Sequence, residues 1–103
     1  MFKYYSLKKY SKKLLPTLEK RYGEAQYYSA SQVRATIYQH DFNPKYLPLA
    51  YVLFLEKKAL KNVIYIEFPA LNINQYKQEI CQYLADKQDD SCLQSLHTLV
   101  VNG

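Results

Sequence analysis

The stretch Leu47-Pro48-Leu49-Ala50-Tyr51-Val52-Leu53-Phe54-Leu55 decides the fold, because it contains no charged residue and only one side-chain hydroxyl. A helix without a polar face is normally buried on all sides. The stretch is also about half as long as the roughly 18 apolar residues that span a bilayer. It therefore predicts a buried helix and no integral membrane association. The expected core residues are Leu47, Ala50, Tyr51, Leu53 and Phe54.

The length and composition of the chain favour one helical domain. It has 103 residues, of which 49% are apolar, which suits a single domain over residues 1–103 with a real core. Only Gly23 and Gly103 are glycines, whereas tight hairpin turns depend on glycine. We therefore predict an all-α fold, a compact orthogonal bundle of five or six short helices around a buried central helix.

Residues 3–22 predict the first helical segment. Steps of 100° per residue place one apolar row on its inner side. Pro16 interrupts this pattern, so two short helices meeting near residues 13–16 and one kinked helix are both consistent with it. Gly23 fits the position just past the end. The expected inner residues are Tyr4, Leu7, Tyr10, Leu14, Leu15, Leu18 and Tyr22.

The next two helices have recognisable starts. Ser29 and Gln32 form a capping box that predicts a helix through about His40. Asn43 is a suitable N-cap, and Pro44 an acceptable first residue, for the apolar helix. The expected inner residues of the helix after Ser29 are Ala30, Val33, Ile37 and Tyr38.

The second half of the chain holds one ambiguous segment. Residues 63–68 contain β-branched and aromatic residues typical of a strand, but residues 56–62 look helical and no second strand is evident. We therefore predict a helix that Pro69 closes. Two further helices follow, one capped by Asn74 and one by Asp90 or Ser91. Their expected buried residues are Tyr76, Ile80, Tyr83, Leu84, Leu93, Leu96 and Val100.

Positive charge is concentrated at the beginning of the chain. The formal net charge is +5, and residues 1–22 contain seven basic residues against one acidic residue. A lysine face opposite an apolar row is typical of helices that bind partners or anionic membrane surfaces, although most lysine faces only keep a surface helix solvated. The lysines on this face are Lys8, Lys9, Lys12, Lys13 and Lys20.

The chain also contains twelve tyrosines and four phenylalanines, more than a small core accommodates. Tyrosine is enriched at protein interfaces, although rings lying over helix crossings are the alternative. The tyrosines of interest are Tyr5, Tyr10, Tyr27, Tyr28, Tyr46 and Tyr65. We predict a non-catalytic protein-interaction module that binds a protein partner or a second copy. Its predicted partner-binding residues are Tyr5, Tyr27, Tyr28, Lys8, Lys9, Lys12, Lys13 and Arg34.

Nucleic-acid binding is the alternative function. Residues 15–40 resemble a helix-turn-helix, in which the second helix presents polar side chains to bases. The connection between the two helices is longer than the usual three or four residues, and a capped amphipathic helix explains the same letters. The candidate base-reading residues are Gln32, Arg34, Thr36 and Gln39.

Motifs for catalysis are absent from the sequence. His40 and Asp41 are adjacent at an expected helix end, and Cys92 and His97 point to different sides of a helix. Cys81 and Cys92 lack the paired spacing of zinc sites, and we expect both to be free, half-buried thiols. We therefore expect no enzyme activity, no cofactor, no metal and no small-molecule substrate. The lysine-rich start lacks a secretory signal, which favours a cytoplasmic location.

Two segments resemble a known family. Residues 29–38, Ser-Ala-Ser-Gln-Val-Arg-Ala-Thr-Ile-Tyr, and residues 42–51, Phe-Asn-Pro-Lys-Tyr-Leu-Pro-Leu-Ala-Tyr, are similar to a family of short uncharacterised bacterial proteins, a domain of unknown function. The resemblance covers most of the chain. It implies a bacterial, cytoplasmic protein and assigns no functional residue.

Overall fold

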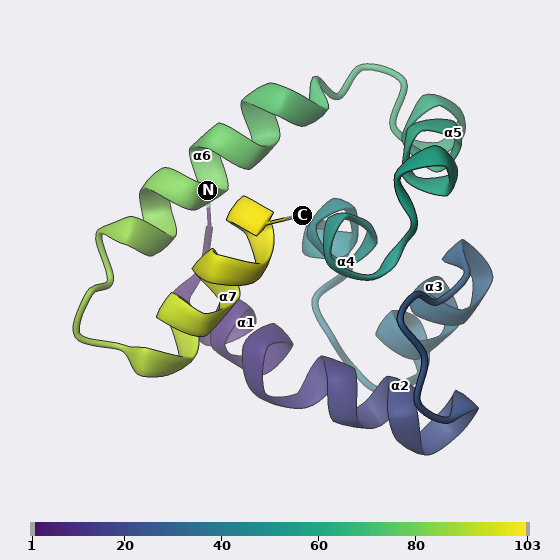
Figure 1. Ribbon diagram of the computed structural model, residues 1–103, viewed down its shortest axis with the longest axis horizontal. Helices are drawn as coiled ribbons and strands as arrows, with labels where there is room; N and C mark the ends of the chain where they lie inside the picture. Colours follow the sequence, from purple (N-terminus) through teal and green to yellow (C-terminus); the bar gives the residue numbers. More distant parts are fainter. Residues whose placement is uncertain (1, 103) are drawn as a thin grey trace.

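The computed structural model describes residues 2–102, and within that range all regular secondary structure is helical (Figure 1). The radius of gyration is 12.8 Å, which matches the roughly 13 Å of a compact chain of about 100 residues. The predicted all-α fold is therefore confirmed. The elements are α1 (Tyr4–Lys9), the π-helical turn η1 (Tyr10–Leu14), α2 (Leu15–Tyr22), α3 (Ala30–Gln39), the 3₁₀ turn η2 (Pro44–Tyr46), α4 (Leu47–Phe54), α5 (Lys57–Glu67), α6 (Ile73–Ala85) and α7 (Ser91–Asn102).

The first segment is one continuous helical run that contains the π turn η1. This widened turn directly precedes α2, whose second residue, Pro16, has no amide hydrogen to donate. A π turn holds more residues than an α turn, so it shifts the phase of the apolar row. Leu14 and Leu18 remain buried, but Leu15 is 40% and Tyr22 37% exposed. The prediction that these two side chains face inward is therefore wrong: Leu15 lies about 100° around the helix from buried Leu14, and Tyr22 is the last residue of α2.

The turn to α3 depends on Gly23, which adopts φ +85°, a conformation that residues other than glycine rarely adopt. Ser29 then forms the predicted capping box with Gln32. On α3, Val33, Thr36 and Ile37 are buried, whereas Tyr38 is 62% exposed. Val33, Thr36 and Ile37 form the inward face of α3, from which Tyr38 is rotated by about 100°, and the Thr36 hydroxyl donates to the Gln32 carbonyl. The prediction of an inward Tyr38 is therefore wrong.

Helix α4 is buried at every residue except Leu53, which is half-buried. The prediction that Leu53 is a core residue is therefore wrong. The turn η2 precedes it, and Asn43 caps that turn as expected, with its Oδ1 accepting from the Lys45 amide at 3.0 Å. α4 contacts α3, α5 and α7, which lie around it in Figure 1.

Helix α5 extends through Glu67, so the helical prediction for residues 63–68 is confirmed. The start of α6 differs from the prediction, because Asn72 rather than Asn74 caps it by accepting from the Gln75 amide at 3.0 Å. Pro69 has already ended α5, which leaves only a short loop before α6. The predicted inner residues of α7, Leu93, Leu96 and Val100, are all buried.

Asp90 joins the two ends of the chain. Its Oδ1 caps α7 by accepting from the amides of Cys92 at 3.0 Å and Leu93 at 3.2 Å. Its Oδ2 accepts from the hydroxyl of Tyr4, and the Nζ of Lys8 lies 3.7 Å away. The hydrogen bond from Tyr4, together with the α7 amides and Lys8, lowers the pKa of Asp90.

A lowered pKa in the folded protein means that ionised Asp90 stabilises the fold. This stability is present above the unfolded-state value of about pH 4 and is lost as the pH falls through the lower folded value. We expect Asp90→Asn to lower the free energy of unfolding at pH 7, and the gap to wild type to narrow at pH 3. Urea unfolding at both pH values measures this gap. Asp89→Asn, on the exposed neighbouring residue, is the control, and an equal Asp90→Asn gap at both pH values would contradict the interpretation.

Candidate functional site

Two of the four predicted partner-binding lysines are engaged within the fold. The Nζ of Lys8 donates to the hydroxyl of Tyr4 at 3.2 Å and lies near Asp90. The Nζ of Lys9 donates to the carbonyl of Asp41 at 2.7 Å and lies 4.9 Å from the centre of the Phe42 ring. These contacts tie the first helix to α7 and to the end of α3. Lys8 and Lys9 therefore have structural contacts within this chain.

The other two lysines, Lys12 and Lys13, are exposed. They line a shallow, cation-rich hollow of about 300 Å³ on the surface of η1 and α2. None of the residues that line this hollow is acidic. We call it the basic hollow, and its remaining lining residues are Pro16, Thr17, Lys20, Arg21 and His40.

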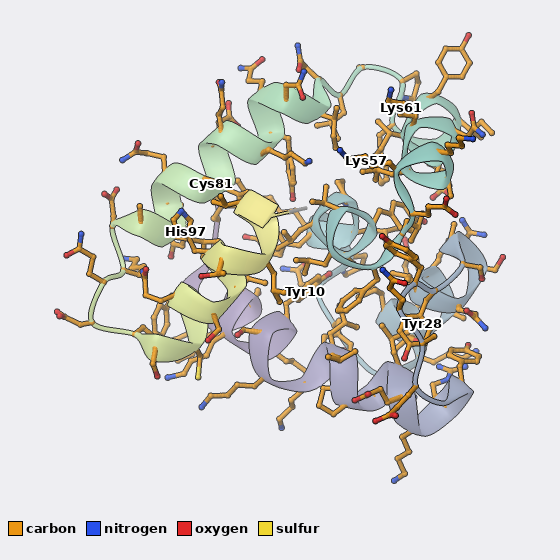
Figure 2. The ribbon with its side chains drawn as sticks, in the orientation of Figure 1. Tyr10, Tyr28, Lys57, Lys61, Cys81 and His97 are labelled. Carbon is orange, nitrogen blue, oxygen red and sulfur yellow. The ribbon has the colours of Figure 1, made fainter. Side chains whose placement is uncertain are left out.

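The predicted tyrosines separate into two groups. Tyr5 is 85% and Tyr27 48% exposed, so both remain available to a partner. Tyr28 is only 5% exposed, because its ring packs edge-on against Phe54 and its hydroxyl donates to the carbonyl of Gly23 at 2.8 Å. Tyr28 is therefore a core residue (Figure 2), and little of its surface is accessible to a partner. Of the other tyrosines of interest, Tyr65 is exposed, and Tyr10 and Tyr46 are buried.

Arg34 is held by a network that joins three helices. Its Nη1 donates to Glu67 of α5 at 2.5 Å and lies 3.4 Å from the hydroxyl of Tyr51 on α4. That hydroxyl donates to the other oxygen of Glu67 at 2.7 Å. Burial and the Glu67 carboxylate raise the pKa of Tyr51, which keeps the phenol protonated as a donor. Arg34 therefore fixes the end of α5.

Three of the four polar residues proposed to read bases are engaged or buried within the fold. Gln32 completes the capping box through its side-chain oxygen, Thr36 is fully buried, and Arg34 pairs with Glu67. Gln39, at the end of α3, is exposed. The α3 surface therefore offers few free groups for base recognition.

An apolar groove with a lysine rim lies between α5 and the start of α6, a site that sequence reasoning missed. It has a volume of about 470 Å³. Its floor includes the buried residues Leu60 and Ile64, and Leu71 and Ile73 come from the opposite side. We call it the α5–α6 groove. Its lining residues are Lys57, Leu60, Lys61, Ile64, Tyr65, Phe68, Pro69, Leu71, Ile73, Asn74 and Lys77.

The rim of the α5–α6 groove is positively charged. Lys57 and Lys61 are exposed on α5, and Lys77 is half-buried on α6. No carboxylate lines the groove, and none of these ammonium groups pairs with a carboxylate within the described residues. In Figure 2, Lys57 and Lys61 lie on the side of α5 that faces α6. The groove therefore combines an apolar floor with unneutralised positive charge.

Two rows along α5 build this wall, and the sequence contains their signal. Residues 60, 64 and 68 form an apolar row, and residues 57, 61 and 65 form a Lys-Lys-Tyr row beside it. Residues four apart lie on the same face of a helix. Once residues 57–67 are known to be helical, the sequence predicts both rows. The groove beside them, however, depends on how far α6 diverges from α5.

Other kinds of site find little support in the fold. Among residues 2–102, no group of three or more histidine, cysteine or acidic residues is placed to hold a metal ion. No helix in this range is long and apolar enough to cross a membrane. Cys81 on α6 and Cys92 on α7 are free and half-buried, as expected. Burial raises the pKa of the Cys81 thiol, which disfavours the reactive thiolate.

The fold and its groove define a small all-helical protein with an unpartnered apolar surface. The model of a family of unknown function (DUF6559) matches residues 1–103, so the chain belongs to that family. The resemblance to a domain of unknown function is thereby confirmed, and membership assigns no activity to any residue. No curated protein and no solved structure matches the chain.

The network around Glu67 generates a stability prediction for the α5 wall. We expect Glu67→Gln to lower the free energy of unfolding by about 1 kcal/mol or less, because the ion pair is partly exposed. Amides in the last turn of α5 should exchange hydrogen faster, whereas those of α7 should not. Hydrogen exchange followed by NMR measures both. Glu24→Gln, in the exposed loop after α2, is the control. Unchanged exchange in α5 would mean that the network does not hold the helix.

Proposed function

We propose that this protein is a non-catalytic protein-interaction module that binds an acidic partner protein in the α5–α6 groove. The observation that carries the proposal is the apolar floor beneath Lys57, Lys61 and Lys77, which pair with no carboxylate among residues 2–102. Buried apolar anchors supply much of the energy of protein association, and charges around them guide the partner and fix its register. The groove offers both features.

The exposed positions of Tyr5, Tyr27 and Tyr65 support the same function. Tyr65 lines the groove itself, so a partner seated there has a broad aromatic surface at its edge. A cytoplasmic location, in a bacterial cell as the resemblance implies, belongs to this proposal. The free thiols of Cys81 and Cys92 support such a reducing compartment.

A photoreactive amino acid at position 61 tests the proposed function in cells that make the protein. We expect this residue to cross-link one partner protein. The same photoreactive residue in place of Lys58, which is exposed but lies outside the groove, should not cross-link that partner. The partner, identified by mass spectrometry and purified, should bind the wild-type protein directly. Lys61→Glu should weaken this affinity at least about tenfold, and Lys58→Glu about threefold or less. Equal affinities for wild type and Lys61→Glu would contradict the proposal.

Nucleic-acid binding is a second candidate function, favoured by the basic hollow alone. Its cations Lys12, Lys13, Lys20 and Arg21 face no carboxylate among the described lining residues. Such a surface would contact phosphates rather than read bases, since three of the four proposed reading residues of α3 are engaged or buried.

Duplex binding tests this second candidate. If the basic hollow binds phosphates, affinity for a short DNA or RNA duplex should fall with salt, with a logarithmic slope of about −0.9 per contacted phosphate of B-DNA. The double variant Lys12→Glu/Lys13→Glu should lose most of this binding, and Lys57→Glu should retain it. Fluorescence anisotropy across a salt series measures both. A lack of binding at low ionic strength would exclude this function.

A further inference from the structure

We propose that the partner segment recognised by the α5–α6 groove is an amphipathic α-helix whose apolar stripe is flanked by carboxylates on both sides. This inference rests on the proposed protein-interaction function and specifies the chemistry of its partner. It is carried by the juxtaposition of the two α5 rows with the opposite wall of Leu71, Ile73 and Lys77.

The shape of the groove favours a linear, regularly spaced occupant. Leu60, Ile64 and Phe68 repeat every four residues, so their row extends about 12 Å along α5 at 1.5 Å per residue. The groove volume of about 470 Å³ lies within the range of small-ligand pockets, roughly 300–1,000 Å³. The groove is therefore too small to enclose a helix. A partner helix would therefore lie over the groove and insert only its apolar side chains.

The other common modes of peptide recognition fit the groove less well. Strand addition requires an open sheet edge, and residues 2–102 contain no strand. Phosphopeptide recognition relies mainly on clustered arginines, whereas every cationic residue that lines the groove is a lysine. Polyproline segments dock between aromatic rings, whereas most of this floor is aliphatic. An apolar row at helical spacing is the feature that receives a helix.

The lysines specify where the partner carries its charge. Lys57 and Lys61 are four residues apart, so their positions along the α5 axis differ by about 6 Å. Carboxylates four residues apart on a partner helix have the same spacing. Lys77 lies on the opposite wall, so it would pair with a carboxylate on the other flank of the partner's apolar stripe. Leucine, isoleucine or phenylalanine between these flanks would contact Leu60, Ile64 and Ile73.

Synthetic helices provide the probe. A fluorescent 16-residue peptide carries two apolar residues four positions apart, with glutamates on both flanks, and its matched control carries lysines in place of those glutamates. We expect wild-type protein to bind the acidic peptide with micromolar affinity, measured by fluorescence anisotropy. Binding should also raise the peptide's helical circular-dichroism signal. The basic peptide should bind at least about tenfold more weakly.

Two variants locate the binding. The double variant Lys57→Glu/Lys61→Glu should bind the acidic peptide at least about tenfold more weakly than wild type. Lys58→Glu, on the same helix but outside the groove, should change this affinity about threefold or less. All three lysines are exposed, so the folds should remain intact, and circular dichroism of each variant checks this. Equal affinity for the acidic and basic peptides, or equal effects of the two variants, would overturn the proposal.

The remaining outcomes separate this inference from the proposed function. If neither peptide binds while position 61 still cross-links a protein partner, the partner is not an acidic helix and the proposed function stands. If position 61 captures nothing as well, both fail. If light scattering shows a dimer of wild-type protein that Lys61→Glu dissociates, the occupant is a second copy and the acidic-helix inference is overturned.

Discussion

The structure depends on burying α4, a helix that has no polar face and therefore must be covered on most sides. Each fully buried leucine, isoleucine or phenylalanine contributes about 1.5–3 kcal/mol, whereas a partly exposed ion pair contributes about 1 kcal/mol or less. Seven of the eight α4 residues are buried. The placement of α3, α5 and α7 against α4 is therefore determined mainly by apolar contact, and their polar interactions adjust the arrangement.

The α5–α6 groove is a consequence of this constraint. Leu60 and Ile64 of α5 are buried at the floor, but their row continues to Phe68, which is only half-buried. The ring of Tyr51 on α4 lies 6.3 Å from that of Phe68, and Arg34 and Tyr51 hold Glu67. These contacts fix the end of α5 next to α3 and α4. The short loop then leads to α6, which packs against α7, and the groove is lined by residues of α5, this loop and the start of α6.

Local chemistry made much of the fold predictable, whereas the surface sites required the packing. The Ser29 capping box and the Asp90 cap satisfy amides within a few residues, so their letters predict the helix starts. The π turn at Tyr10–Leu14 has no comparable signature in the sequence. Tyr27 and Tyr28 are adjacent and chemically identical, so only the tertiary structure separates the exposed ring from the buried one. The groove was missed because the divergence of α5 and α6 is not encoded in either helix alone.

The central claim is that the unpaired apolar and cationic wall of α5 is the binding surface of this protein. Two-dimensional ¹⁵N–¹H NMR spectra, recorded while an acidic amphipathic peptide is added, test it most directly by reporting which backbone amides sense the ligand. The account predicts shifts confined to residues 57–77. Shifts concentrated in residues 12–21, around the basic hollow, would contradict it, as would spectra that do not change at all.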